Sequence, residues 1–282
     1  MPDYYEAEKM KFKKAFLRSY IAEAPLALAI ERTLECEILS KQSFERPVLD
    51  LGCGEGVFAS ILFNELVDAG VDLNARELDA AKRYRTHKEL IHCSADNIPK
   101  PDGSYNTIFS NSVLEHIPNI DDVLKESLRL LTPSGHFYVT LPTNYFEQYC
   151  FGNLFLSRLG MPSMAQRFRR FYNNFWKHFH CYSTDDWEAL FERSGFEVRQ
   201  TIMYCPKKIT LLNDLLTWPA MLSFIVKKIF NRWFVFKKMR FYLSGFYASI
   251  IRIDFSVDSG LQAGGLVFFD LVKRHDEKYK QA

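Results

Sequence analysis

The segment VLDLGCGEGVFA, residues 48–59, limits most strongly what this chain can fold into. The apolar run at 47–51 has the length and the aliphatic residues of a short buried strand. Helix-forming residues follow from Val57 onward. The alternate glycines between them allow a sharp turn and let a ligand approach the main chain closely. We therefore expect a strand, a glycine turn and a helix whose first N–H groups face a ligand.

The rest of the chain alternates strand and helix patterns, which is typical of a doubly wound, mostly parallel α/β sheet. Seven strands are expected, at 47–51, 70–73, 90–95, 105–111, 136–141, 196–204 and 265–273. Helices are expected at 6–40 in two pieces broken near Pro25, and at 55–67, 77–87, 120–131 and 184–194. Residues 1–45 thus form an N-terminal helical segment before the first strand.

The composition is that of an ordinary globular protein, with 282 residues of which 48% are hydrophobic and 25% charged. The opening residues 1–14 are polar and predict no signal peptide. The six cysteines are scattered and show no spacing of paired metal ligands. We expect a reduced cytoplasmic protein without metal ligands.

The glycine spacing and the nearby acids indicate which ligand the turn accepts. The pattern is G-x-G-x-G, and Val57 occupies the position of the third glycine in the dinucleotide fingerprint G-x-G-x-x-G. Acidic residues stand at or after the predicted strand ends, namely Asp50, Glu55, Asp72 and Asp96. This acidity would repel a pyrophosphate and attract a cationic sulfonium that carries an α-amino group.

Four motifs together resemble those of the class I S-adenosylmethionine-dependent methyltransferases, with a core similar to the small-molecule methyltransferases of type 11. They are the segment 48–56, the acid in 71–73, the pair Ala95-Asp96 and the segment 109–117. The likeness covers about 46–143, 180–204 and 265–273, and it departs from the family at Thr132-Pro-Ser-Gly, where Lys-Pro-Gly-Gly is usual. The resemblance implies a seven-stranded, Rossmann-like methyltransferase fold with a core at 46–143, 184–205 and 265–275.

The resemblance also implies a cofactor site for S-adenosylmethionine, with S-adenosylhomocysteine as its product. Asp50 and the main chain of residues Gly52, Cys53 and Gly54 would hold the methionine end. Asp72 would bind the ribose hydroxyls, and Leu73 would contact the adenine. Asp96 beside Ala95 would meet the adenine amino group, and the Asn111 carbonyl would lie near the methionine amine.

Two insertions, 144–183 and 206–264, follow predicted strands and should form one helical cap over the transferred methyl group. Residues 144–182 hold five Lys or Arg against Glu147, and residues 206–253 hold nine against Asp214. Aromatic residues are interleaved with these bases, a pattern found in membrane-surface helices and in nucleic-acid binders. The apolar stretch 209–226 falls short of a spanning helix. A plainly buried cap helix is the third interpretation.

Together these features predict a methyltransferase that acts on a small or lipid-linked, anionic acceptor. O-methylation of a saccharide or glycolipid precursor is favoured, and the protein is expected in the cytoplasm, at the inner face of the membrane. An RNA methyltransferase and a non-catalytic docking module are the alternatives. As general base we expect His180 first and His116 second, with His178 as a further candidate, since His178 and His180 alternate and would face one side of a strand.

Overall fold

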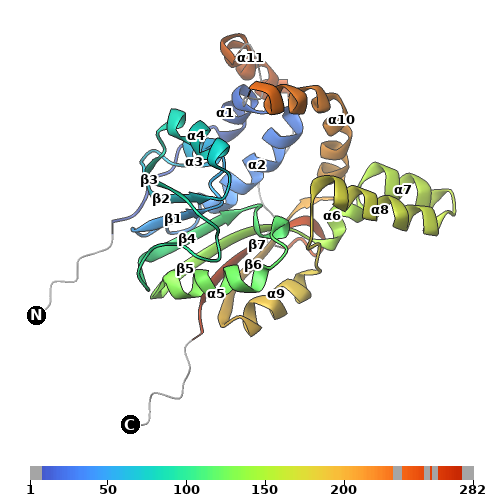
Figure 1. Ribbon diagram of the computed structural model, residues 1–282. Helices are drawn as coiled ribbons and strands as arrows, with labels where there is room; N and C mark the ends of the chain where they lie inside the picture. Colours follow the sequence, from blue (N-terminus) through green and yellow to red (C-terminus); the bar gives the residue numbers. More distant parts are fainter. Residues whose placement is uncertain (1–7, 231–236, 251–254, 256–259, 275–282) are drawn as a thin grey trace, which may run out of the picture.

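The computed structural model describes residues 8–230, 237–250, 255 and 260–274 (Figure 1). Its centre is a seven-stranded sheet in the order β3-β2-β1-β4-β5-β7-β6, in which β7 alone runs antiparallel to its neighbours. The strands are β1 Val48–Leu51, β2 Val67–Asp72, β3 His87–His92, β4 Tyr105–Asn111, β5 Leu131–Pro142, β6 Phe196–Pro206 and β7 Gly264–Lys273. The predicted doubly wound, mostly parallel sheet is therefore confirmed.

Helices cover both faces of the sheet (Figure 1). One hydrophobic cluster joins the sheet to α1 Phe16–Glu23, α2 Leu26–Leu39 and α3 Val57–Leu62. A second cluster joins it to α5 Ile120–Leu130 and α9 Thr184–Arg193. In α5 the buried residues Ile120, Val123 and Leu124 recur at helical spacing and form the face that packs on the sheet.

Several predicted boundaries were wrong. Residues 8–15 are not helical, because Phe12 forms a bridge with Phe63 and packs its ring against Phe44 and Phe63. The helix α3 ends at Leu62, since Val67 already begins β2. The helix α4 Ala75–Tyr84 ends before His87, which is the first residue of β3.

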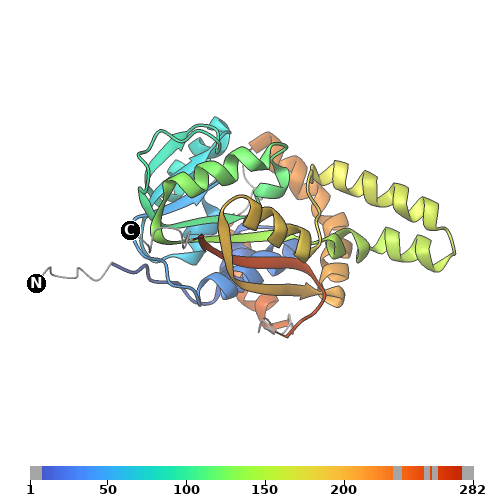
Figure 2. The same cartoon turned by 90° about the horizontal axis from the view of Figure 1, so that it is seen from below.

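The two insertions form separate groups of helices. Between β5 and α9 lie α6 Asn144–Gln148, α7 Phe151–Arg158 and α8 Pro162–Trp176, of which α7 and α8 form a hairpin that extends away from the sheet (Figure 2). Between β6 and β7 lie α10 Lys207–Phe230 and α11 Lys237–Ile250. Helix α10 packs on α2 and contacts α7, and α11 packs on α1.

The two insertions also meet through a hydrogen bond, because the Phe151 main-chain N donates to Asp214 Oδ2 at 2.8 Å. Within the described ranges, none of the helices combines the length and hydropathy needed to cross a bilayer.

Candidate active site

The glycine loop at 52–56 lies at the carboxyl end of β1, tied to β2 by hydrogen bonds from the Gly52 and Cys53 N–H groups to the Val71 carbonyl. Gly52 has φ +79°, and a Cβ there would lie 2.5 Å from Val113 Cγ1. Gly54 has φ +51°, and a Cβ there would meet no heavy atom of the described residues within 4 Å. The main chain at Gly54 therefore borders open space that a ligand can enter.

The carboxylate of Asp72 joins the glycine loop to the end of β2. Its Oδ2 accepts a hydrogen bond from Gly54 N at 2.9 Å, and its Oδ1 accepts one from Asn74 N at 2.7 Å. Next to it, the Leu73 side chain is 69% exposed and its carbonyl accepts a hydrogen bond from His92 Nε2. The predicted ribose and adenine contacts thus lie at one edge of the sheet, where parallel α/β folds bind their ligands.

Residues Ala95 and Asp96 lie in the turn after β3, rather than in or directly after the predicted strand, because β3 ends at His92. Asp96 is exposed and Ala95 is half-buried. The turn lies at the carboxyl ends of the parallel strands β2 and β3, the edge of the sheet that also carries Asp72.

Asp50 is buried, and its carboxylate contacts a histidine. Its Oδ2 lies 3.0 Å from His87 Nε2, and His87 Nδ1 lies 2.9 Å from Thr86 Oγ1. Burial raises the pKa of Asp50, and the hydrogen bond to His87 opposes this rise. The sequence analysis missed His87 because it assigned that position to a helix. The pair links the end of β1 to the first residue of β3.

Asn111 belongs to a buried hydrogen-bonding group that we call the Glu35 network, formed by Arg32, Glu35, Asn111, Ser112 and Tyr204. Asn111 Nδ2 donates to Glu35 Oε2 at 2.8 Å, and its Oδ1 accepts from Thr140 Oγ1 at 2.9 Å. Arg32 Nη1 donates to both Glu35 oxygens at 2.8 and 2.7 Å. The network joins α2 to the end of β4. Its two members in α2, Arg32 and Glu35, were not identified from the sequence.

A cavity of about 290 Å³ lies beside this network. Its walls come from α2, from the segment after β4, from α8 and from α10, so both insertions contribute to it. Its charged lining residues in the described part of the chain are three carboxyl side chains and one guanidinium: Glu31, Glu115, Asp214 and Arg32. Burial raises the pKa of Glu31 to about 7. The size suits a small molecule or one end of a longer one.

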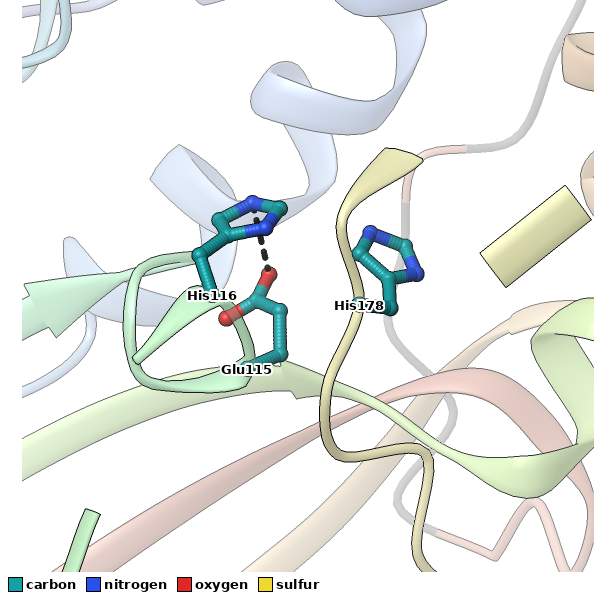
Figure 3. Close-up of side chains that lie close together, drawn as sticks. All are labelled: Glu115, His116 and His178. Carbon is teal, nitrogen blue, oxygen red and sulfur yellow. Dashed lines mark ion pairs between the residues drawn. The ribbon is translucent and has the colours of Figure 1, made fainter. Parts of the chain in front are cut away.

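His116 and His178 line the cavity, with their ring centroids 5.1 Å apart (Figure 3). His180 lies outside the cavity lining, and its ring nitrogens contact Tyr182 Oη and the Ile117 carbonyl, each at 2.9 Å. The expectation that His178 and His180 face one side of a strand was wrong. The segment is irregular, because Lys177 ends α8 with φ +56° and no strand follows.

Glu115 joins the two cavity histidines, and sequence reasoning missed it although it stands next to His116 in the quoted motif. Its Oε1 lies 3.8 Å from His116 Nε2. Burial raises the pKa of Glu115 to about 8 and lowers the pKa of His178 to about 4; burial also lowers the pKa of His116. Both imidazoles are therefore neutral near neutral pH.

Helix α10 connects the cavity to the glycine loop. Its first half contributes Thr210, Asn213 and Asp214 to the cavity lining. In its second half, Lys227 Nζ forms ion pairs with Glu55 in the glycine loop and with Glu77 of α4, the latter at 3.3 Å. One helix thus borders both parts of the site.

Known proteins share this sequence pattern and fold. A family model described as a methyltransferase domain matches residues 17–201. Two ubiquinone biosynthesis O-methyltransferases are similar in part: that of Vibrio campbellii is 27% identical over 114 residues (38% of this chain, 48% of that protein), and that of Pectobacterium carotovorum subsp. carotovorum is 30% identical over 111 residues (36% and 45%). The chain spans about half the length of these curated relatives.

Solved structures share the fold at low sequence identity. The geranyl diphosphate C-methyltransferase of Streptomyces coelicolor, solved with Mg²⁺, geranyl diphosphate and S-adenosyl-L-homocysteine, has a TM-score of 0.54 at 15% identity and covers 88% of this chain and 82% of its own. The [4+2]-cyclase SpnF has a TM-score of 0.53 at 14% identity, with the same coverage. These likenesses support the Rossmann-like methyltransferase architecture.

Proposed function

The chain belongs to the methyltransferase domain family, whose cofactor is S-adenosylmethionine, and we propose that it methylates an oxygen atom of an acceptor held in the cavity between α2, α8 and α10. The observation that carries this proposal is the pairing of two features. The glycine loop and Asp72 offer a cofactor cradle, and α10 links that cradle to a separate cavity with polar groups. Family membership favours an enzyme over a non-catalytic docking module.

The cradle suits this cofactor chemically. The open space beside Gly54 admits a ligand to the main chain, and the carboxylates of Asp72 and Asp96 match a cation and its ribose and adenine donors. When bound, S-adenosylmethionine supplies a methyl carbon that is already activated by a sulfonium. What remains for the protein is to align the acceptor and to exclude water.

Transfer to oxygen is supported by the cavity and by the relatives. A hydroxyl acceptor must lose its proton during the transfer. Glu115, His116 and His178 lie together in the cavity, and both neutral imidazoles can act on a hydroxyl. His180 is not included, because both of its ring nitrogens contact the Tyr182 hydroxyl and the Ile117 carbonyl. The O-methyltransferase activity in the names of the partial relatives is consistent with this proposal.

The lining argues for an amphipathic, lipid-linked acceptor rather than an anionic saccharide. Arg32 is the one cation among the charged groups of the described lining, and it already donates to Glu35 and Ser112, so an anionic group would have to compete for it there. The exposed arginines of the first insertion do not line the cavity. Arg158, Arg167 and Arg170 lie on the surface of the α7–α8 hairpin. The anionic partner predicted from the cap's charge therefore fits the outside of the hairpin better than the cavity.

We propose that this partner is an anionic membrane surface. The hairpin carries large apolar side chains that are 46–62% exposed, namely Phe151, Phe155, Leu159, Met164, Phe171 and Phe175. Apolar and basic residues combined on one projecting element are typical of helices that bind in the bilayer interface (Figure 2). The other side of α8 contributes Tyr172 and Trp176 to the cavity. A lipid-linked acceptor could thus reach the cavity while its tail stays in the bilayer.

RNA is the alternative anionic partner. Its binding would need a basic path that leads into the site, whereas the described cavity lining holds three carboxyl groups. A membrane partner requires no such path, because only the head of the acceptor enters.

The cofactor proposal is tested by calorimetric titration of S-adenosylhomocysteine into the wild-type protein and Asp72→Asn. We expect about tenfold weaker binding by the variant, since hydrogen bonds to a charged acceptor are lost. Asp79→Asn, in an exposed pair with Lys82, is the matched control and should bind normally. Absence of binding by a folded wild type, or equal binding by Asp72→Asn, would contradict the proposal.

The membrane proposal is tested by co-sedimentation with vesicles of phosphatidylcholine, with and without phosphatidylglycerol. We expect binding only to the anionic vesicles, and its loss in Arg167→Glu/Arg170→Glu. The matched control is Arg193→Glu/Arg199→Glu, which reverses two bases whose side chains are 62% and 54% exposed outside the hairpin. Steeply salt-dependent binding to RNA without vesicle binding would favour the alternative.

A further inference from the structure

Three side chains from two distant chain segments meet in the acceptor cavity. Glu115 and His116 come from the short helix η1 Leu114–His116, and His178 comes from the loop after α8. One potential ligand atom from each residue lies within 4.8 Å of the other two. Figure 3 shows the Glu115 carboxylate beside His116, with His178 facing them from the neighbouring loop.

Glu115 is short of hydrogen-bond partners. Its side chain is 3% exposed, and its Oε2 is buried without a hydrogen-bond partner among the described residues. Burying a carboxylate in this way is unfavourable unless a cation or a proton compensates it. Arg32, the guanidinium that lines the same cavity, donates to Glu35 and to Ser112. The carboxylate of Glu115 is therefore suited to a cation that enters the cavity.

Hydrogen bonds orient both imidazoles for coordination. His116 Nδ1 lies 3.2 Å from the Lys177 carbonyl, which can only accept, so this nitrogen carries the hydrogen and Nε2 keeps its lone pair. That Nε2 is the atom next to Glu115 Oε1. The Cys181 thiol donates to Asn173 Oδ1 and lies 3.8 Å from His178 Nδ1, where its sulfur can accept the ring hydrogen.

Main-chain hydrogen bonds hold the two segments together. The Glu115 carbonyl accepts from Phe179 N at 2.8 Å, and His178 N donates to the Asn173 carbonyl at 2.9 Å. The main chain thus holds the two segments of the ligand group side by side, with Glu115 buried, His178 half-buried and His116 exposed. Two atoms bonded to one ion at about 2.0–2.2 Å lie about 3.0–4.4 Å apart. Rotation of an imidazole about its soft χ2 angle is enough to close the difference.

We propose that Glu115, His116 and His178 bind one divalent transition-metal cation in the acceptor cavity. Two imidazoles and one carboxylate suit Zn²⁺, Mn²⁺, Fe²⁺ or Co²⁺, whereas Mg²⁺ and Ca²⁺ prefer oxygen ligands throughout. Three protein ligands also leave coordination positions open for another molecule. No metal ligands were predicted from the sequence. Glu115 and His116 stand 63 and 62 positions before His178, which is not a spacing that indicates a metal site.

A second step rests on the proposed function: the open position of the cation binds the acceptor oxygen. The cation lowers the pKa of the bound hydroxyl, which releases its proton to water. The oxygen lone pair then forms the C–O bond, and the C–S bond breaks with its electron pair remaining on sulfur. In this step the bound cation, and not an imidazole, makes the hydroxyl lose its proton, because the histidine lone pairs are used to hold the cation.

The test is a titration of the full-length protein with Co²⁺, followed by the visible d–d absorption and by calorimetry. We expect a stoichiometry of one and competition by Zn²⁺. Glu115→Gln and His178→Asn should each weaken binding by at least about 100-fold, since loss of outer-shell partners alone weakens metal binding by about 10–100-fold. His136→Asn is the matched control, because the His136 side chain is 39% exposed, pairs with Asp270 and lies outside the cavity lining.

The same proteins are titrated with S-adenosylhomocysteine to separate this proposal from the previous one. Normal cofactor binding with no Co²⁺ binding by the wild type, or with equal Co²⁺ binding by wild type and both ligand variants, would overturn the metal site alone. Co²⁺ binding without cofactor binding would instead overturn the proposed methyl transfer. Retained cofactor binding by His178→Asn shows in addition that the variant is folded.

Discussion

Glu35 and Glu115 are both buried carboxylates beside the acceptor cavity, and they differ in their partners. Glu35 accepts hydrogen bonds from Arg32, Asn111, Ser112 and Tyr204. Glu115 has a buried Oε2 without a hydrogen-bond partner in the described part of the chain. Both oxygens of the Glu35 carboxylate are thus used within the fold, whereas one oxygen of the Glu115 carboxyl group has no such partner.

The comparison separates a structural role from a ligand-binding role. A satisfied network with a cation and several donors rigidifies the segments that it joins, here α2, the end of β4 and β6. An unsatisfied carboxylate contributes little to folding and persists where a ligand needs it. Changes to the two groups should therefore affect different measurements.

The largest effect is expected from Arg32→Met, which leaves Glu35 buried without its cation. Breaking a buried ion pair by removing one partner typically costs about 3–5 kcal/mol of folding free energy. Urea unfolding followed by circular dichroism measures this loss. The double variant Arg32→Met/Glu35→Leu should recover much of it, because neither charge remains unpaired. If the single variant loses less than about 1 kcal/mol of folding free energy, the Glu35 network does not stabilise the fold in the way that we propose.

An intermediate effect is expected from Lys227→Met, which removes the cation that joins α10 to the glycine loop. The side chains of Lys227, Glu55 and Glu77 are 14–26% exposed, so the ion pairs are partly shielded from water. We expect about tenfold weaker binding of S-adenosylhomocysteine by calorimetry, about 1.4 kcal/mol. Lys82→Met is the control, because its ion pair with Asp79 is exposed. Unchanged affinity in Lys227→Met would show that α10 does not hold the cofactor loop.

A smaller, pH-dependent effect is expected where a paired charge lies near the surface. Asp270 accepts a hydrogen bond from His136 at 2.7 Å and raises the pKa of this histidine. A raised pKa in the folded state means that the stabilisation is present below the unfolded value of about 6.5 and is lost as pH rises through the folded value. Because the His136 side chain is 39% exposed, less than about 1 kcal/mol is expected.

The measurement is the difference in unfolding free energy between wild type and Asp270→Asn at about pH 6 and about pH 9. The difference should be larger at the lower pH. A difference that grows toward the higher pH would contradict the assigned direction.

The smallest effect on stability is expected from Glu115→Gln. Replacing a carboxyl group that lacks partners by an amide of the same shape should change the unfolding free energy by less than about 1 kcal/mol, or raise it. Urea unfolding measures this change under the conditions used for Arg32→Met. A loss of unfolding free energy as large as that of Arg32→Met would show that Glu115 stabilises the fold as Glu35 does.

Local patterns in the sequence were sufficient for the sheet and for the glycine turn. The strand, glycine turn and helix at 48–62 are consecutive, and each residue type there has a direct backbone consequence, as the positive φ of Gly52 and Gly54 shows. Periodicity likewise identified β4 and α9 with their observed ends or nearly so. The predicted ends of helices were wrong where tertiary contacts competed with local preference, as at Phe12 and His87.

Only the tertiary structure decided how the acceptor side is assembled. The pairing of Asp50 with His87, the Glu35 network, and the meeting of Glu115 and His116 with His178 each join segments that are far apart in the chain. Two histidines in one loop illustrate the reason. His178 and His180 are equivalent by spacing, but only His178 lines the cavity, whereas His180 contacts Tyr182 and the Ile117 carbonyl. The packing of elements that are distant in the chain determines which side chains meet. The spacing of residues along the chain does not specify that packing.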